Sequence, residues 1–487
     1  MTVTTSMKWP AMLVAGSIGA GLLATPTQAQ DDYVPRAEHE QLKAELETLR
    51  LRLDGVEQQA EEIDRALPSA AERADDSQRN GLMFDTGNFK PGWERVRNPN
   101  WMEHGKLDEM NVQIGRAGPI DLYMGLNTAG RLQYLHQRNV EIGGISQPNS
   151  LEPGFQTAWG SLEFLADLYD GGLEVYFDVY LSSPPHPDSP QGHEGYMLMR
   201  HIPGTEGTML GNLFEVVNVK AGQFEIDFGD HRYRRTDNAR TQRNPLIGNH
   251  VMDAKTTEIG MEVFNAEPGT FNWLVGFGSG SETGGFMDGR GLSAHGKVWA
   301  NLGELRLGGS GYYVNHESDS GARSNLFRTS RDGGVYQGVM SGNAPGQVFV
   351  GSGQTVLAVQ GDVTWIKDAI EIYGNLGWVS DDTNAGEDEE WLYYGIEGAY
   401  YLNERLYVAA RYSGAAAQRL NGQSSSGLVH RGQIGGGYWL YDTVLAKVEY
   451  VHQIYNDFDQ ASGRVSGVDV SEDPSFNGLI MEVSFSF

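Results

Sequence analysis

The sequence predicts an all-β fold: a 16-stranded antiparallel transmembrane β-barrel that follows an N-terminal helical coiled coil. Three observations support this class. Apolar and polar residues alternate over long stretches, connections alternate between short and long, and the final strand ends on Phe487. Alternate side chains of a strand point to opposite faces, and short turns at one end with long loops at the other are typical of outer-membrane barrels.

Composition narrows the class of protein further. The 487 residues include 64 glycines and no cysteine, 39% are hydrophobic, and the net charge is −28. This hydrophobic content is too low for a helical membrane protein but normal for a barrel, in which every second residue faces water. The acidic balance argues against a nucleic-acid partner. Because cysteine is absent, the chain has no disulfide or haem attachment motif, and we predict no cofactor and no metal site.

The N-terminus has the features of a secretory signal peptide. Lys8 precedes an apolar run over 11–24 that is too short to span a membrane, and Thr27-Gln-Ala29 follows as a cleavage site. We predict that residues 1–29 are the signal peptide, with cleavage after Ala29. Export fits a protein of the bacterial outer membrane.

Residues 30–68 are predicted to form a periplasmic coiled coil. Apolar residues follow an unbroken 4-3-4-3 spacing that Pro68 ends, with charged residues between them. The seam consists of Leu42, Leu46, Leu49, Leu53, Val56, Ala60, Ile63 and Leu67. Such a narrow seam favours self-association, most simply as a homotrimer stalk, over a helix packed on its own domain; the oligomer number is not fixed by these residues. Residues 69–118 are predicted as a linker or as a segment in the barrel mouth or lumen.

Residues 119–487 are predicted to form the barrel. Segments with alternating apolar residues lie near 120–126, 155–169, 173–182, 213–224, 256–265, 271–277, 292–301, 305–314, 356–366, 370–378, 391–401, 406–413, 429–439, 444–454 and 477–487. The closing strand must run toward the periplasm, and strand directions must alternate. Counting back from it shows that one strand running toward the periplasm is still needed between 173–182 and 213–224, which would otherwise run in the same direction. We assign residues 194–202 to that strand, which gives an even count of sixteen.

The third outer loop, 225–255, is the predicted functional element. It is rich in arginine, although the chain has 64 acidic and 36 basic residues. A guanidinium presents a rigid fork of donors that matches carboxylate and phosphate oxygens, and rings of such groups at a constriction select anions. The residues predicted at this pore constriction are Arg232, Arg234, Arg235, Arg240 and Arg243, with Lys220 from the adjoining wall. A solvated loop, or one that binds lipopolysaccharide phosphates, is the alternative.

The segment that leads into this loop resembles a known family. It reads Val219-Lys-Ala-Gly-Gln-Phe-Glu-Ile-Asp-Phe-Gly229 and follows Tyr196, Arg200 and Leu213-Phe214. It is similar to the segment before the constriction loop in the phosphate-selective porin O and P family, and the resemblance covers 119–487. It implies a trimeric 16-stranded porin whose third loop folds into the lumen. The coiled coil is similar to that of the related trimeric dicarboxylate porins. The lysine and arginine ladder of the phosphate channels has no residue-by-residue match here.

The predicted wall favours a different selectivity, because parity places more acids than bases on its inward face. The inward bases are Arg131, Lys220, Lys297, Arg306, Arg411, Arg431 and Lys447. The inward acids are Asp121, Glu163, Glu174, Asp178, Glu258, Glu262, Asp362, Glu371, Glu397, Glu449 and Glu482. A general or cation-preferring porin is therefore an alternative. A barrel scaffold for a periplasmic electron-transfer partner is a third hypothesis.

The sequence contains no motif of a familiar catalytic centre. It lacks a His-Glu-x-x-His motif and a nucleophile elbow, and the glycines of Gly276-Phe-Gly-Ser-Gly280 are not followed by the helix that a dinucleotide site requires. We therefore predict a channel and not an enzyme. Its predicted partners are outer-membrane lipid, lipopolysaccharide and small anionic solutes such as phosphate or carboxylates.

Overall fold

The computed structural model describes residues 81–85 and 112–487, apart from short gaps at 143, 150, 157–158, 170, 183–189, 237–239, 281–291, 316–325, 328–334, 341–345, 351–354, 384–385, 459–463, 466–467 and 471. The predicted signal peptide, the coiled coil and most of 69–118 lie outside the described residues. The described part belongs to one compact unit, 78–487. No helix in it is long and apolar enough to cross a membrane.

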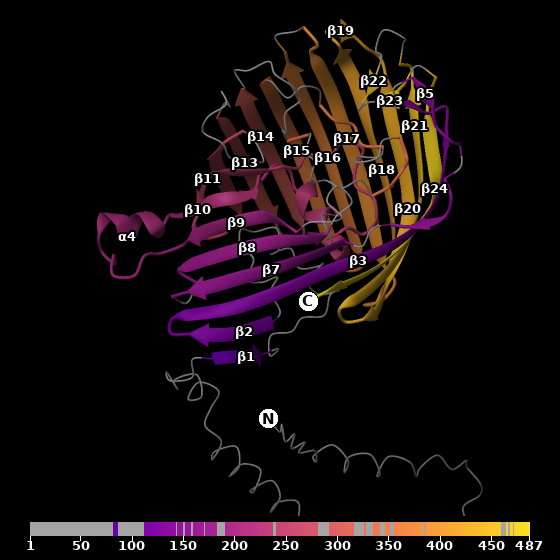
Figure 1. Cartoon of the computed structure of the whole chain (residues 1–487). Coiled ribbons are helices and arrows are strands. Elements are labelled where there is room, and N and C mark those ends of the chain that lie inside the picture. Colours follow the sequence, from indigo (N-terminus) through magenta and orange to yellow (C-terminus); the bar gives the residue numbers. More distant parts are fainter. Residues whose placement is uncertain are drawn as a thin grey trace, which may run out of the picture. The chain divides into compact units, whose positions relative to one another are not determined.

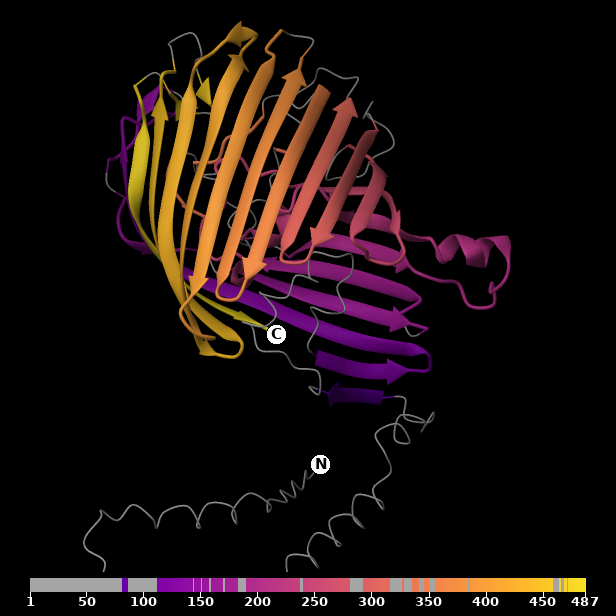
Figure 2. The same cartoon turned by 180° about the vertical axis from the view of Figure 1, so that it is seen from behind.

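Sixteen antiparallel strands form a closed barrel (Figures 1 and 2). β3 (Ile120–Arg138) pairs with β7 on one side and with the C-terminal strand β24 (Ser475–Ser486) on the other, which closes the sheet. The strands between them are β7 (Trp159–Leu168), β8 (Leu173–Ser182), β9 (Gln191–Met199), β10 (Val217–Glu225), β11 (Thr257–Asn265), β12 (Phe271–Gly278), β13 (Ser293–Leu302), β14 (Leu305–Asn315), β15 (Thr355–Lys367), β16 (Ile370–Asp382), β17 (Glu389–Tyr401), β18 (Leu406–Leu420), β20 (Leu428–Tyr441) and β21 (Val444–Asn456). The predicted strand count is confirmed.

Alternation along each strand separates an outer apolar face from an inner polar face. In β24, Leu479, Met481 and Val483 are 43%, 50% and 52% exposed, whereas Ile480 and Glu482 between them are buried. β15, β16 and β21 repeat this pattern. An apolar outer face on a closed barrel matches the lipid of the bacterial outer membrane, because closure leaves no unpaired strand edge in the hydrocarbon.

Short turns mark the periplasmic end of the barrel. Residues 303–304, 368–369 and 442–443 form the turns after β13, β15 and β20. The connection between β9 and β10 lies at this same end, because it alternates with the long loop between β10 and β11. It is longer than the other turns and contains a short helix, α4 (Met209–Phe214), that projects from the barrel rim (Figures 1 and 2).

Small elements extend the barrel at its two ends. At the periplasmic end, β1 (Gly81–Asp85) pairs with β2 (Val112–Ala117), which pairs with the start of β3. Among the outer loops, a second sheet contains β4 (Glu141–Ile142), β5 (Ile145–Ser146), β22 (Arg464–Val465) and β23 (Val468–Asp469). The two-residue strands β6 (Gly154–Phe155) and β19 (Gln423–Ser424) pair with β3 and β18.

Several strand boundaries differ from the prediction, and two of the differences change a connection. The predicted strand 213–224 begins too early, because Leu213 and Phe214 belong to α4 and β10 starts at Val217. The predicted strand 406–413 ends too early, since β18 continues to Leu420 and pairs there with β19. The strand assigned by parity to 194–202 is confirmed as β9 with earlier bounds.

The closing seam contains a buried ion-pair group. Glu482 on β24 accepts a hydrogen bond from Arg131 Nε at 2.6 Å and pairs with Lys447 Nζ at 2.8 Å. All three side chains are inaccessible to solvent. The E482Q variant would therefore leave two buried cations without this counter-charge, and breaking a buried pair typically costs about 3–5 kcal/mol. We expect a lower guanidinium midpoint for barrel unfolding, measured by the mobility shift of the folded form in gels.

A surface pair provides the control for this variant. Lys367 and Glu304 lie 3.1 Å apart and are each about half exposed. Exposed pairs of this kind contribute roughly 0–1 kcal/mol. The E304Q variant should therefore unfold near the wild-type midpoint, and equal midpoints for E482Q and E304Q would contradict the assignment of the seam.

Candidate functional site

The connection between β10 and β11, residues 226–256 (the third loop), folds into the lumen. Its ends are joined by a hydrogen bond from the Ile226 N–H to the Thr256 carbonyl at 3.0 Å. It contains two 3-10 helices, η3 (His231–Arg234) and η4 (Thr241–Arg243). Most of its described residues are buried. In the alternative arrangement, a solvated outer loop, these residues would be exposed. The inward fold that the family resemblance implied is present.

Backbone contacts tie the third loop to opposite sides of the wall. The Gly229 N–H donates to Ser310 Oγ on β14 at 3.0 Å, and the Val251 N–H donates to Ser413 Oγ on β18 at 3.3 Å. On β21, the Lys447 ammonium donates to the carbonyls of three loop residues at 2.7–3.1 Å; these are Thr241, Asn244 and Leu246. The loop therefore crosses the lumen and does not follow one side.

Arg234 and Arg235 make two separate ion-pair groups. Arg234 reaches Glu371 on β16 and Glu397 on β17, with 2.6 Å between its Nη2 and Glu397 Oε1. Arg235 turns back to Asp253 within the loop, with 2.6 Å between Nη2 and Oδ2. Burial alone would lower the pKa of Arg234, but the two carboxylates outweigh burial and raise this pKa well above its usual range. Both guanidinium groups are therefore paired with buried carboxylates.

Arg240 enters a group of carboxylates from three adjacent strands. Its Nε donates to Glu163 Oε1 on β7 at 3.0 Å, and its Nη2 donates to Asp178 Oδ2 on β8 at 3.2 Å and to Glu194 Oε2 on β9 at 3.1 Å. The same Nη2 donates to the Tyr176 hydroxyl at 2.8 Å. Arg240 is thus the positive centre of a buried acidic cluster.

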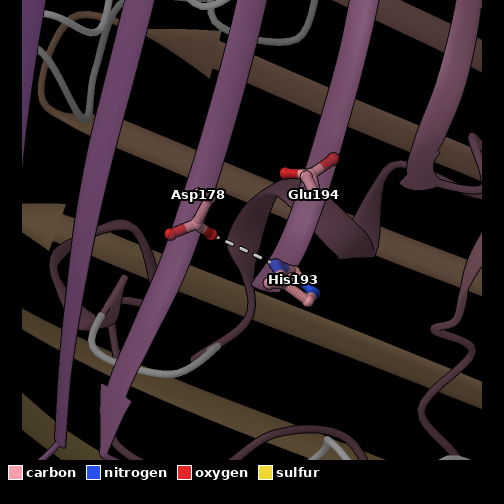
Figure 3. Close-up of side chains that lie close together, drawn as sticks. All are labelled: Asp178, His193 and Glu194. Carbon is pink, nitrogen blue, oxygen red and sulfur yellow. Dashed lines mark hydrogen bonds and ion pairs between the residues drawn. The ribbon is translucent and has the colours of Figure 1, made fainter. Parts of the chain in front are cut away.

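Three members of this cluster have the donor types of a metal site. Asp178, on β8, lies close to His193 and Glu194, on β9 (Figure 3), and one ligand atom from each lies within 4.8 Å of the others. His193 Nδ1 is 3.2 Å from Asp178 Oδ2. However, the Arg240 guanidinium contacts the carboxylates of Asp178 and Glu194, so a cation would have to compete with it for these oxygens.

The other predicted site residues lie apart from Arg240. Arg232 Nε lies 3.2 Å from Asp227 Oδ1, and the Arg232 guanidinium packs over the Tyr233 ring. Arg243 is partly exposed at the end of η4. Lys220 on β10 pairs with Glu262 on β11 at 2.5 Å. The structure therefore places the five arginines on one loop, but their side chains reach different parts of the wall.

The wall also supplies cations to loop acids. Lys297 Nζ lies 2.8 Å from Asp227 and 2.9 Å from Asp230, and Arg306 Nε donates to Asp230 at 2.9 Å. Burial alone would raise the pKa of Asp230, but Lys297 and Arg306 outweigh burial and lower this pKa to about 2. Loop arginines thus pair with carboxylates of the wall, and cations of the wall pair with carboxylates of the loop.

A second lumen segment, residues 326–350 with its gaps, packs beside the third loop. It belongs to the outer loop between β14 and β15, and most of its described apolar residues are buried. The Lys255 N–H donates to the Leu326 carbonyl at 2.6 Å, and the Val348 N–H donates to the Val251 carbonyl at 2.9 Å. Sequence reasoning missed this inward fold. The many apolar residues of a predicted surface loop were the available signal.

Glu449 and Arg431, on neighbouring strands, hold both segments to the wall. Glu449 Oε2 accepts from the N–H groups of Ile247 and Gly248 at 2.7 and 3.0 Å, and its Oε1 accepts from the Tyr336 hydroxyl at 2.6 Å. The Arg431 guanidinium donates to the carbonyls of two lumen residues, Asn249 at 2.8 Å and Gly346 at 2.6 Å. Strand alternation predicted that both side chains face the lumen, but it did not predict the loop residues that they contact.

Acid is expected to weaken the docking of the third loop through His231. Its Nε2 donates to the Ala254 carbonyl at 2.9 Å, and its Nδ1 accepts from Gln360 Nε2 at 3.1 Å, which fits a neutral ring. Burial lowers the pKa of His231 to about 4, whereas a released loop would have the ordinary value of about 6.5. Between these values the released loop binds more protons, so docking is fully stable above pH 6.5 and weakens toward pH 4. At pH 5 the free energy of docking is less favourable than above pH 6.5 by about 2 kcal/mol.

Cleavage in the loop measures this effect. Endoproteinase Glu-C cuts after acidic residues and works at both pH values, so cleavage after Asp230 or Asp253 should be faster at pH 5 than at pH 7.5, relative to a peptide standard. In H231Q the amide mimics the Nε2–H donor but does not titrate, and its normalised cleavage should be much less sensitive to pH. Identical pH dependence in H231Q and wild type would refute the role of His231.

Comparisons with known proteins agree with this fold. No protein-family model and no curated protein match the sequence. Among solved structures, the chain is similar to an anion-selective porin from Comamonas acidovorans, with 13% identity and a TM-score of 0.50 over 76% of this chain and 100% of that one. It is also similar to the outer-membrane channel DcaP of Acinetobacter baumannii, with 13% identity and a TM-score of 0.48 over 76% and 99%. OmpT, an outer-membrane protein of Vibrio cholerae, has 11% identity and a TM-score of 0.49 over 76% and 99%. The chain therefore has the fold of outer-membrane porins.

Proposed function

We propose that this protein is an outer-membrane porin through which small anionic solutes diffuse passively. The observation that carries the proposal is the course of the third loop, which crosses the lumen and contacts both β14 and β21. A loop in this position narrows the aqueous path within a barrel of sixteen strands, which would otherwise be wide. Solutes are then selected where the path is narrowest, because charges are least screened there.

The loop arginines favour anions by cancelling the acidity of the wall. Arg240 offsets part of the negative charge of the carboxylates on β7, β8 and β9, and Arg234, together with Arg411, offsets that of the carboxylates on β16 and β17. Without the arginines these acids would repel an anion that has lost part of its water. With them, the barrier to phosphate or a carboxylate is lower, and guanidinium donors next to the path can replace lost hydration.

A cation-preferring porin is the second candidate, and two inward carboxylates favour it. Glu258 accepts hydrogen bonds from Tyr312 Oη at 2.7 Å and from the Gly280 N–H at 2.9 Å, and Asp362 accepts from Tyr373 Oη at 2.7 Å. Neither forms an ion pair with Lys or Arg within the described residues. Their negative charge would attract cations if the path follows that side of the lumen.

The narrower features of the proposal rest on sequence. Similarity to the phosphate-selective porin O and P family supports phosphate as one solute, and the heptad seam of residues 30–68 supports a homotrimer with a periplasmic stalk. Glutaraldehyde cross-linking in detergent should give a trimer band that is lost when 30–68 is deleted. Cross-linking that stops at the monomer would count against the stalk.

Channel recordings test the proposal as a whole. In planar lipid bilayers the purified protein should give stepwise conductance in KCl, and liposomes that contain it should swell faster in phosphate or succinate salts than in neutral sugars of equal size. Absence of conductance steps would favour the scaffold hypothesis. Steps with equal or faster entry of organic cations would favour the cation-preferring porin.

A further inference from the structure

The helix α4 at the periplasmic rim carries an apolar stripe that no described residue covers. Met209 is 92% exposed, Leu210 44%, Leu213 51% and Val216, just after the helix, 64%. At about 100° per residue these four side chains fall within an arc of roughly 120°. They therefore form one continuous face, which we call the α4 stripe.

The rest of α4 is built to present this stripe outward. Thr208 caps the helix by accepting a hydrogen bond from the Gly211 N–H at 3.2 Å, and Gly211 itself packs closely on the backbone of Thr205. Phe214 is buried on another side of the helix. Glu215 lies opposite the stripe, Asn212 lies beside its edge, and both are exposed. The helix is thus held by its small, aromatic and capping residues, whereas its largest aliphatic side chains remain largely exposed.

The stripe continues into the lipid-facing wall of the barrel. Val216 precedes β10 directly, and its carbonyl accepts from the Ala266 N–H at 2.9 Å, which fixes it at the strand end. In β10, Val217 and Val219 point outward, because the residues that alternate with them, Asn218 and Lys220, are buried on the lumen side. Val216, Val217 and Val219 are all uncharged, so apolar residues join the stripe to this outer face along the chain.

We propose that α4 is a membrane anchor whose stripe inserts into the headgroup and acyl-chain boundary of the periplasmic leaflet. Amphipathic helices bury their apolar face about 5–10 Å into this boundary, and the polar Asn212 and Glu215 face would remain in water. A protein partner fits less well, because a specific interface buries about 800 Å² on each side and a six-residue helix presents much less. The proposal concerns the surface of the barrel and does not depend on which solute crosses the lumen.

Site-directed spin labelling tests this proposal, and the chain has no native cysteine to remove. The L213C variant places a nitroxide on the stripe, and E215C places one on the opposite face as a matched control. Both full-length proteins are reconstituted in vesicles of phosphatidylethanolamine and phosphatidylglycerol, after the gel shift has confirmed folding. Collisions with oxygen report lipid, and collisions with a water-soluble nickel chelate report the aqueous phase.

We expect the oxygen-to-nickel collision ratio to be at least several-fold higher at position 213 than at position 215. Equal ratios with free access of nickel to both labels would overturn the proposal, because the helix would then stand in the periplasm. A label at 213 that is shielded from both reagents and shows spin–spin broadening would also overturn it, in favour of a second copy of the chain on the stripe.

Discussion

The R240Q variant should release the third loop from the β7–β9 wall. Arg240 is the guanidinium shared by the carboxylates of Glu163, Asp178 and Glu194, which are themselves almost fully buried. Glutamine has no charge and cannot reach all three groups, so the carboxylates would repel one another in a site of low polarity. Losing one partner of a buried charge group costs about 3–5 kcal/mol. We expect faster Glu-C cleavage within the loop and a larger, noisier single-channel conductance.

Two further variants distinguish the charge of Arg240 from its size. R240K keeps the charge but loses the fork geometry, so it should be intermediate. The double variant R240Q/E194Q removes one acid with the base and should recover part of the loss, which a double-mutant cycle measures as coupling energy. If R240Q has wild-type cleavage and conductance, Arg240 does not hold the loop.

Regular alternation made the barrel predictable from sequence. A period of two residues fixes which side chains face the lumen, so the inward positions of Arg131, Lys220 and Glu482 followed from parity, and all three are buried. Irregular positions did not follow. Leu213 and Phe214 were predicted to begin the strand that became β10. They belong instead to α4, a helix that begins after its N-cap, Thr208.

The partners of the loop arginines could not be predicted. Arg234 and Glu397 are 163 residues apart, and Arg240 is 77 residues from Glu163. Such pairs depend on where the loop lies in the lumen, which neither spacing nor charge determines. The sequence therefore indicated the arginines and the loop that carries them, whereas their pairing with wall carboxylates became apparent only from three-dimensional contacts.

The R234Q variant should shift the channel toward cations. Arg234 lies between Glu371 on β16 and Glu397 on β17, and Arg411 also pairs with Glu397. Removing Arg234 leaves one net negative charge beside the proposed path. A unit charge near partly hydrated ions changes their energy by about 1 kcal/mol, or roughly fivefold in relative permeability at low salt. The permeability ratio of K⁺ to Cl⁻ should rise by that order.

The compensating variant R234Q/E371Q is the control for this change. It removes one acid with the base and should return the permeability ratio toward the wild-type value. A ratio that rises equally in R234Q and R234Q/E371Q would mean that loop movement, and not charge, causes the effect.

The reversal potential under a KCl gradient tests the central claim most directly, measured for the wild type and for the variant with glutamine at Arg232, Arg234, Arg235, Arg240 and Arg243. The proposal predicts a wild-type potential of the sign that anion preference gives, and a change toward cation preference in the variant, because the wall carboxylates are no longer neutralised. A wild-type channel that prefers cations, with a potential that the five substitutions leave unchanged, would contradict the claim that the third loop selects anions.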